Sequence, residues 1–341
     1  VGSEMCIRDR GCKTNIYESE SMAELFRESG YEIITDDNAP ADVCVVNTCT
    51  VTGMGARKSR QQIRRAKRQN PNALIAVTGC FSQTSPEEVR ELGADIIIGN
   101  KGRSKIVELV KAAEQGKKAD IVDNILTEHE YEELPVTHTQ SRVRANIKIE
   151  DGCNNFCTYC IVPYVRGRER SRKPQDIIRE IEKLVADGVV EVMLLGQNVN
   201  SYGKNLDTPV TFAQLLQEVE KIEGLERIRF MTSHPKDLSD ELIEVMKNSD
   251  KICRHLHLPL QSGSTKILKA MNRRYTKEQY LELAAKIRRE IPDISLTTDI
   301  MVGFPGETAE DVDDTIDVIR KVGFDNAFTF IYSCLLYTSD A

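Results

Sequence analysis

Three cysteines in the middle of the chain have a spacing that suits iron chemistry. Cys153, Cys157 and Cys160 form a C-x3-C-x2-C group. Thiolates at this spacing can bind three irons of a cubane cluster, which leaves the fourth iron without a protein ligand and open to a small molecule. The alternative is a structural zinc site, but a closed zinc site needs a further Cys or His, and none lies within ten residues of the group. The spacing therefore predicts a catalytic cluster.

Three other cysteines lie far apart in the sequence but share one position relative to the predicted strands. Cys12, Cys49 and Cys80 each stand at or next to the carboxyl end of a strand. Because parallel strands end at the ligand-binding edge of an open sheet, these thiols could meet around a second cluster. The alternative is that they are small buried hydrophobic residues. We prefer that alternative for Cys44 and Cys253, which lie within or at the start of an apolar strand.

Short apolar strands alternate with helical patterns from residue 11 to residue 114, which is typical of an open parallel α/β sheet. The predicted strands are Val43–Val46, Leu74–Thr78 and Ile96–Ile98, and the predicted helices are Glu18–Glu28, Arg57–Gln69, Pro86–Leu92 and Ser104–Ala113.

Both ends of the chain differ from the rest in their pattern. Residues 1–10 and 334–341 are expected to be non-native ends, so Cys6 and Cys334 are set aside. Residues before Gly11 should supply the first strand of the parallel sheet, and we expect residues 1–10 to form that strand poorly.

A polar, acidic segment at residues 115–141 is expected to be a linker, and a second α/β domain follows at residues 142–333. Six strands with helical patterns after the first five predict an incomplete parallel barrel with its active site at the carboxyl ends of the strands. The predicted strands are Asn146–Glu150, Val190–Leu195, Arg227–Thr232, His255–Pro259, Ser295–Val302 and Ala327–Tyr332.

The composition is that of a cytoplasmic protein with two domains. The 341 residues exceed what one hydrophobic core usually supports, and no apolar run approaches the roughly 20 residues of a membrane span. No secretory signal opens the sequence, so its ten cysteines are expected to be reduced thiols.

The net charge of −7 gives no overall signal for nucleic acid, but two local patches are basic. Seven of the twelve residues at 57–68 are Lys or Arg, and a second run follows the cysteine loop. The alternative for the first run is a solvated helix face. The predicted phosphate-binding residues are Arg57, Lys58, Arg64, Arg65, Arg166, Arg168, Arg170 and Arg172.

The cysteine loop, with the aromatic Tyr159 just before its third cysteine, resembles the radical S-adenosylmethionine superfamily. The resemblance implies that S-adenosylmethionine binds the open iron and supplies a radical. It also implies cofactor contacts by two loops at strand ends, where glycines let the backbone approach a ligand. These residues are Gly196, Gln197, Asn198, Gly303, Pro305, Gly306 and Glu307. No catalytic role is assigned to His234, His255 or His257, and no catalytic residue is assigned beyond the clusters.

The segments 11–15, 47–50 and 78–80 resemble the amino-terminal domain of the methylthiotransferase family. The resemblance implies a flavodoxin-like domain with an auxiliary 4Fe–4S cluster, a partial (β/α)6 radical barrel with its own 4Fe–4S cluster, and a carboxyl-terminal RNA-binding β-barrel. That last piece is absent, so the chain is expected to be truncated. The implied partners are a tRNA and an electron donor such as flavodoxin or ferredoxin, with no membrane, and the chain is expected to be a monomer.

The resemblance implies transfer of a methylthio group to carbon 2 of the modified adenosine next to the anticodon. Residues 47–52 and 58–70 resemble the threonylcarbamoyladenosine type, whereas residues 194–203, 232–235 and 255–263 resemble the isopentenyladenosine type. This predicts a chimeric sequence, and we favour the isopentenyl substrate. The alternatives are methylthiolation of a ribosomal-protein aspartate and a non-catalytic iron–sulfur or zinc scaffold that binds RNA.

Overall fold

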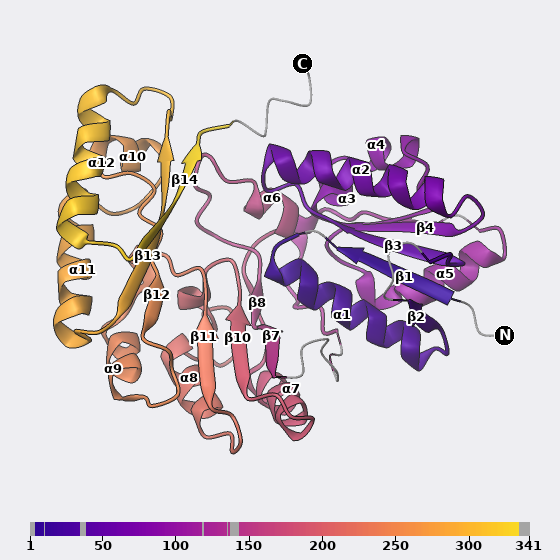
Figure 1. The fold of residues 1–341 in the computed structure, drawn as a ribbon, viewed down its shortest axis with the longest axis horizontal. Coiled ribbons are helices and arrows are strands. Elements are labelled where there is room, and N and C mark those ends of the chain that lie inside the picture. Colours follow the sequence, from indigo (N-terminus) through magenta and orange to yellow (C-terminus); the bar gives the residue numbers. More distant parts are fainter. Residues whose placement is uncertain are drawn as a thin grey trace. The chain divides into compact units, whose positions relative to one another are not determined.

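A computed structural model describes residues 4–9, 11–34, 39–117, 119–134, 136 and 143–333. The chain divides into two compact units (Figure 1). The first contains residues 1–141 together with 161–170, and the second contains residues 142–160 together with 171–341. The segment 161–170 therefore packs with the first unit although the sequence places it after the cysteine loop of the second.

The first unit is a six-stranded parallel sheet in the order β2-β1-β3-β4-β5-β6. The first five strands have the strand order of a flavodoxin-like fold, as predicted. The strands are β1 (Glu4–Asp9), β2 (Glu32–Ile34), β3 (Val43–Thr48), β4 (Leu74–Gly79), β5 (Ile96–Ile98) and β6 (Ala119–Ile121). The helices are α1 (Lys13–Glu28), α2 (Gly53–Gln69), α3 (Cys80–Thr84), α4 (Pro86–Glu91) and α5 (Ile106–Glu114), with a short helix η1 (Arg103–Lys105) before α5.

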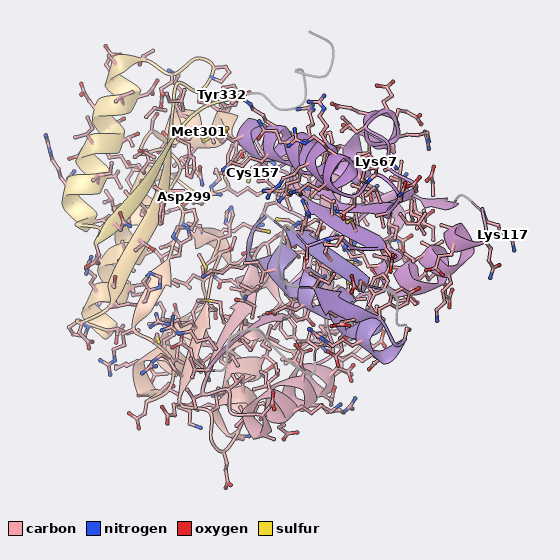
Figure 2. The ribbon with its side chains drawn as sticks, turned by 45° about the vertical axis from the view of Figure 1, so that its right-hand side comes forward. Lys67, Lys117, Cys157, Asp299, Met301 and Tyr332 are labelled. Carbon is pink, nitrogen blue, oxygen red and sulfur yellow. The ribbon has the colours of Figure 1, made fainter. Side chains whose placement is uncertain are left out.

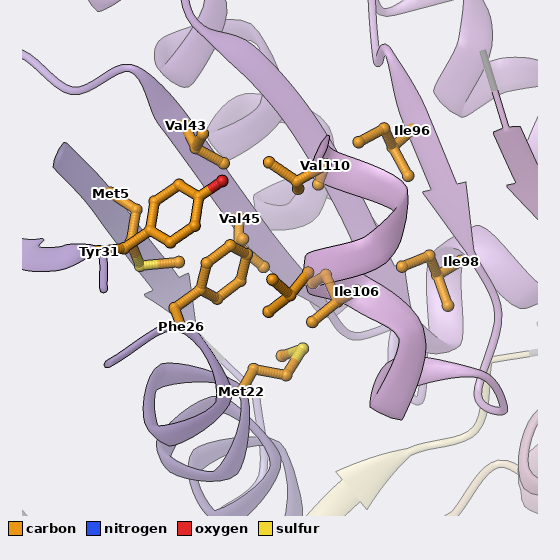
Figure 3. Close-up of a cluster of buried hydrophobic side chains, with 12 residues drawn as sticks. Met5, Met22, Phe26, Tyr31, Val43, Val45, Ile96, Ile98, Ile106 and Val110 are labelled. Atoms are coloured by element: carbon orange, nitrogen blue, oxygen red, sulfur yellow. The ribbon is translucent and has the colours of Figure 1, made fainter. Parts of the chain in front are cut away.

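Two hydrophobic layers cover the two faces of this sheet, because successive strand residues point to opposite sides. On one face α1 and α5 pack on β1, β3, β4 and β5, with Phe26 and Tyr31 in edge-to-face contact at 5.1 Å between ring centroids (Figure 3). On the other face Ile63 of α2, Phe81 of α3 and Val89 of α4 pack on the same strands. Each fully buried side chain of this size contributes about 1.5–3 kcal/mol.

The expectation that residues 1–10 would form a poor strand is wrong. Residues 4–9 form β1, which lies between β2 and β3 and pairs in parallel with both. Met5 and Cys6 are buried in the opposite layers of the core, so the alternation that a central strand requires is present.

The segment 115–141 also contains regular structure. Residues 119–121 add β6 to the sheet edge beside β5, and a short helix η2 follows at Ile125–Thr127. The apolar residues of this segment are few, which is why the sequence pattern indicated a linker.

The second unit is the predicted partial parallel barrel. Its six strands form two three-stranded sheets, β11-β10-β7 and β12-β13-β14, and Ile228 and Ile252 form an additional bridge. The strands are β7 (Arg144–Lys148), β10 (Glu191–Leu195), β11 (Arg227–Phe230), β12 (His255–His257), β13 (Ser295–Val302) and β14 (Asn326–Ile331). Its helices are α7 (Pro174–Ala186), α8 (Phe212–Glu220), α9 (Asp240–Asn248), α10 (Thr265–Ala270), α11 (Lys277–Glu290) and α12 (Ala309–Val322).

Helix starts in this barrel are fixed by local side chains. Thr211 and Gln214 form a reciprocal capping box at α8, and Thr276 and Gln279 do the same at α11. Such caps set where each strand-to-helix loop ends and hence the shape of the barrel mouth. Among the described residues, no helix is both long and apolar enough to cross a membrane.

Candidate functional site

The first unit brings Cys12, Cys49 and Cys80 to one edge of its sheet. Cys12 precedes α1 just beyond β1, Cys49 follows β3 directly, and Cys80 follows β4 directly. Register makes these ends coincide, because Asp9 pairs with Asn47 and Thr48 pairs with Gly79. The three thiols therefore follow the carboxyl ends of adjacent parallel strands.

Buried amides hold this edge together. The Asn15 side-chain amide donates to Asn47 Oδ1 at 3.1 Å and to the Thr48 carbonyl at 2.9 Å. The Asn47 amide donates to the Asn15 carbonyl at 3.0 Å, and the Cys12 thiol donates to Asn15 Oδ1 at 3.1 Å. Because both amides are fully buried, the loop carrying Cys12 is fixed to the end of β3.

Two glycines keep space at the cysteines. Gly79 has φ +103°, and a Cβ at this position would lie 2.4 Å from the Thr48 carbonyl oxygen. A Cβ on Gly55 would lie 3.4 Å from Cys49 Sγ. The hydrogen bond that Cys49 N donates to Ser59 Oγ, at 3.0 Å, fixes the loop between them to α2.

The thiols of this edge influence one another electrostatically. The pKa of Cys80 is raised to about 11, mainly by burial; the Arg166 guanidinium opposes this rise, and the neighbouring thiols of Cys49 and Cys12 add to it. Burial also raises the pKa of Cys49, and Arg166 again acts in the opposite direction. A nearby cation thus favours the thiolate forms that metal binding needs.

That cation belongs to a buried ion cluster. Arg166 donates to both oxygens of Glu18, at 2.9 and 3.2 Å, and Arg103 Nη2 lies 3.3 Å from Glu18 Oε2. All three side chains are almost completely buried. The Asn100 amide donates to Cys80 Sγ at 3.6 Å, and its side-chain oxygen accepts from Arg103. Glu18, Arg103 and Asn100 were not predicted as part of a site, and Arg166 was predicted to bind phosphate, because their partners come together only in the fold.

In the second unit, Cys153, Cys157 and Cys160 lie in the loop that follows β7 and a short strand β8 (Glu150–Asp151). Cys153 and Cys157 are buried and Cys160 is half-buried. The loop is fixed to α10, because Thr158 N donates to the Met271 carbonyl at 3.2 Å and Asn272 donates to the Phe156 carbonyl at 3.0 Å. Figure 2 labels Cys157 in this loop.

Arg273 is a further buried group at this loop that sequence patterns did not indicate. Its Nη1 lies 3.9 Å from Cys157 Sγ and 3.3 Å from the Tyr159 hydroxyl, and its Nε donates to the Tyr275 hydroxyl at 2.8 Å. Burial raises the pKa of Tyr159, so its phenol stays protonated at neutral pH. Tyr159, Met301 and Tyr332 pack against a buried cluster of Ile267, Met271 and Phe304, and Met301 and Tyr332 are labelled in Figure 2.

The glycine loop after β10 contacts the cysteine loop directly. Gln197 Oε1 accepts from Gly152 N at 2.6 Å, and Glu150 Oε1 accepts from Asn198 N at 2.7 Å. A Cβ on Gly196 would lie 2.4 Å from Glu150 Cγ, so only glycine fits there. Gln197 and Asn198 thus support the loop that carries Cys153.

The glycine loop after β13 is open. Gly303 and Gly306 have φ of +77° and +84° with open space where a Cβ would point, and Glu307 accepts a hydrogen bond from Gly303 N. Pro305 is exposed, as is expected for a loop at the barrel mouth. The backbone of this loop is therefore accessible.

Two family models match the chain. The radical SAM superfamily matches residues 147–319, and the uncharacterized protein family UPF0004 matches residues 4–99. A curated relative from Lachnoclostridium phytofermentans, named tRNA-2-methylthio-N(6)-dimethylallyladenosine synthase, is 54% identical over 330 residues, which cover 95% of this chain and 72% of the relative. The chain belongs to the radical S-adenosylmethionine methylthiotransferase family.

A second relative supports this family, and a solved structure shares the fold. A protein of the same name from Thermoanaerobacter sp. is 51% identical over 336 residues, covering 96% of this chain and 70% of the relative. The structure of the radical S-adenosylmethionine methyltransferase TsrM from Kitasatospora setae, with cobalamin and a [4Fe-4S] cluster bound, has a TM-score of 0.72 at 16% identity, and the match covers 97% of this chain and 75% of TsrM. At that identity the match shows the fold alone.

As a member of this family, the enzyme uses S-adenosylmethionine and 4Fe–4S clusters. The residues present fit such groups, because Gly55 leaves room beside Cys49 Sγ and the Gly303 loop leaves its backbone open. Within the described ranges, no three Cys, His, Asp or Glu side chains converge on one metal ion. Cluster ligands are spread more widely, because each thiolate binds its own iron.

The structure corrects the interpretation of three arginines of this methylthiotransferase. Arg166, Arg170 and Arg172 were predicted to bind phosphate, but all three are buried. Arg166 pairs with Glu18, Arg172 pairs with Glu180, and Arg170 donates to the Arg166 carbonyl at 2.9 Å. All three guanidinium groups bind partners inside the protein, where RNA cannot reach them.

The other predicted RNA-binding residues lie on the surface. Arg57, Lys58, Arg64 and Arg168 are exposed and Arg65 is half-buried. Arg57, Lys58, Arg64 and Arg65 lie on α2, the helix that contacts Cys49 through Ser59. The buried face of α2 thus contacts the cysteine edge of the first unit, and its basic residues lie on the exposed face.

Two of the histidines have structural partners. His234 Nδ1 accepts from Lys236 N at 3.3 Å, and burial, with a smaller contribution from Arg273, lowers the pKa of His234 to about 2. His257 Nδ1 lies 3.0 Å from Thr297 Oγ1. Both are buried side chains with hydrogen bonds, and neither needs a catalytic role.

Proposed function

We propose that this methylthiotransferase attaches a methylthio group to carbon 2 of an N6-dimethylallyl (isopentenyl) adenosine next to the anticodon of tRNA. The named relatives support this substrate, since those at 49–54% identity are called tRNA-2-methylthio-N(6)-dimethylallyladenosine synthases. They give no support to the threonylcarbamoyl alternative. A single relative matches both halves of the chain, which gives no support to a chimeric origin.

The observation that carries the proposal is the presence of two separate cysteine triads. We assign Cys153, Cys157 and Cys160 to the radical cluster and Cys12, Cys49 and Cys80 to an auxiliary cluster. When bound, the first cluster and S-adenosylmethionine supply a radical, and the second cluster supplies sulfur. A second triad at a sheet edge is what a transfer of sulfur requires beyond radical formation alone.

The chain's own residues hold these groups. Gln197, Asn272 and Thr158 fix the backbone of the loop that carries the first triad. Asn15 and Asn47 fix the sheet edge that carries the second. We propose that the open backbone at Gly303 and Gly306, with Pro305 and Glu307, contacts S-adenosylmethionine.

RNA contact is proposed for the exposed basic face of α2, with Arg57, Lys58, Arg64 and Arg65, and for Arg168. Such side chains supply salt-dependent affinity for phosphate. We further propose a cytoplasmic monomer that receives electrons from a protein such as flavodoxin or ferredoxin.

Iron counting tests the cluster assignment. Anaerobically reconstituted protein should bind about eight irons per chain, and replacement of either triad by alanine should leave about four. Four irons in the unmodified protein would contradict the second cluster. Replacement of Cys44 and Cys253 by alanine is the matched control and should leave the iron content unchanged.

Nucleoside analysis tests the substrate. A strain that lacks its own methylthiolating enzyme and expresses this chain should contain 2-methylthio-N6-dimethylallyladenosine in its tRNA. Mass spectrometry that finds the methylthio group on threonylcarbamoyladenosine instead would refute the proposed substrate.

A further inference from the structure

The Glu18, Arg103 and Arg166 cluster is buried and contains two cationic side chains for one carboxylate. Two guanidinium groups share one carboxylate, so these three described side chains carry one net positive charge in the interior. Buried ion groups are costly, and replacement by apolar residues is often neutral or stabilising. A compensating negative charge nearby would account for the arrangement.

Asn100 connects this ion cluster to the cysteine edge. Its Nδ2 donates both to Cys80 Sγ, at 3.6 Å, and to the Val165 carbonyl. Arg103 Nη2 donates to the Asn100 side-chain oxygen, and Arg103 Nη1 donates to the Asn100 backbone carbonyl at 2.9 Å. One side chain therefore contacts the sulfur, the second arginine and the residue that precedes Arg166.

The backbone at Arg166 is also held in place. α6 (Val162–Arg166) ends at Gly167, which has φ +78°, and a Cβ there would lie 2.3 Å from the Ile125 carbonyl oxygen. Arg170 Nη2 donates to the Arg166 carbonyl at 2.9 Å. Hydrogen bonds thus hold Arg166 at both ends: Arg170 holds its backbone carbonyl, and Glu18 holds its guanidinium.

We propose that Arg166 is a positioning residue that provides the counter-charge of the iron–sulfur cluster bound by Cys12, Cys49 and Cys80. Glu18 and Arg103 fix its guanidinium beside the thiol edge. The inference rests on the proposed function, which assigns these thiols to a cluster. It gives Arg166, which follows the cysteine loop of the second unit in the sequence, a role in the first unit, where residues 161–170 pack.

The sign of the effect follows from charge. Three thiolates and a doubly positive 4Fe–4S core carry one net negative charge, and uptake of one electron raises it to two. The charge of Arg166 stabilises the reduced form more than the oxidised form, so it raises the reduction potential. No bond forms or breaks in this step, and the electron comes from the reductant added in the titration.

A redox titration of the holoenzyme, followed by electron paramagnetic resonance, tests the proposal. The signal of the auxiliary cluster is identified in the full chain with Cys153, Cys157 and Cys160 replaced by alanine. Arg166→Gln should lower the equilibrium constant for reduction about tenfold, which is about 59 mV for one electron. Glu18→Gln should raise it by a similar factor, and Arg166→Lys should stay near the unmodified protein.

Charge compensation predicts a lower reduction potential for Arg166→Gln and a higher one for Glu18→Gln. A merely structural role would not shift the potentials of the two variants in opposite directions. Arg172→Gln is the matched control, because Arg172 and Glu180 form a buried pair in the second unit. If Arg166→Gln does not assemble the cluster, Glu18→Gln and Arg166→Lys decide the outcome. Eight irons with an unchanged potential in Glu18→Gln would overturn the inference, whereas four irons in the unmodified protein would overturn the cluster assignment beneath it.

Discussion

At the scale of single residues, the cysteine edge depends on positions where only glycine fits. Gly79 is the last residue of β4 and directly precedes Cys80. It has a positive φ, and there is no room for a Cβ at this position. Asn47 Oδ1 would lie 2.7 Å from that Cβ, so the buried amide network would have to move as well. Backbone geometry and thiol placement are therefore coupled at this residue.

Replacement of Gly79 by alanine should destabilise the apoprotein by about 3 kcal/mol or more, from strain at positive φ plus the clash with the Thr48 carbonyl. Gly30→Ala is the control, because Gly30 has φ +87° in open space and should cost only about 1 kcal/mol. Urea denaturation measures both. Equal losses would show that the clash at Gly79 is relieved.

His234 should make stability depend on pH. Burial lowers the pKa of His234 to about 2, so the folded protein binds fewer protons at this site than the unfolded chain below pH 6.5. Stability is therefore lost as the pH falls through 6.5, by about 2 kcal/mol between pH 7 and pH 5.

The variant His234→Asn keeps an acceptor for Lys236 N but cannot titrate. The difference in unfolding free energy between pH 7 and pH 5 should be smaller in the variant by that amount. A pH dependence identical to that of the unmodified protein would show that His234 is not the group responsible.

At the scale of elements, α2 has two distinct faces. Ser59, Ile63 and Ala66 are buried against the sheet, and the basic residues point elsewhere. Thr52 caps the helix by accepting a hydrogen bond from Gly55 N at 3.0 Å. The cap fixes the residue at which the helix begins and hence which residues face the sheet and which face solvent. The helix can thus present cations without disturbing the core.

Replacement of Arg57, Lys58 and Arg64 by glutamine should weaken tRNA binding and reduce the slope of log affinity against log salt by roughly two. Filter binding at several salt concentrations measures this slope. Exposed Arg179 and Lys183 of α7, replaced in the same way, form the control. An unchanged slope in the α2 variant would show that these side chains form a solvated helix face and do not contact phosphate.

At the scale of the whole molecule, the chain returns to its first unit after starting the second. Residues 161–170 pack within the unit formed by residues 1–141 and supply Arg166 to Glu18. The first unit is therefore incomplete when the chain is cut at residue 141.

A fragment of residues 1–141 should be about 3 kcal/mol less stable than one in which residues 161–170 are joined to it, because Glu18 loses a buried partner. Glu18→Gln should destabilise the joined fragment more than the shorter one, in which Glu18 still pairs with Arg103 alone. Urea denaturation of the four proteins tests this. Destabilisation of both fragments to the same extent would mean that Arg166 contributes no net stability.

The sequence by itself predicted the two α/β units and the family and singled out the two groups of cysteines, because cysteine spacing, strand-end positions and apolar periodicity are local properties. It also indicated the glycine loops after β10 and β13. Only the tertiary structure decided that β1 and β6 join the sheet and that Arg166, Arg170 and Arg172 are buried. Whether a basic residue meets water or a carboxylate depends on partners distant in the chain, as Glu18 is from Arg166, and no local pattern records that contact.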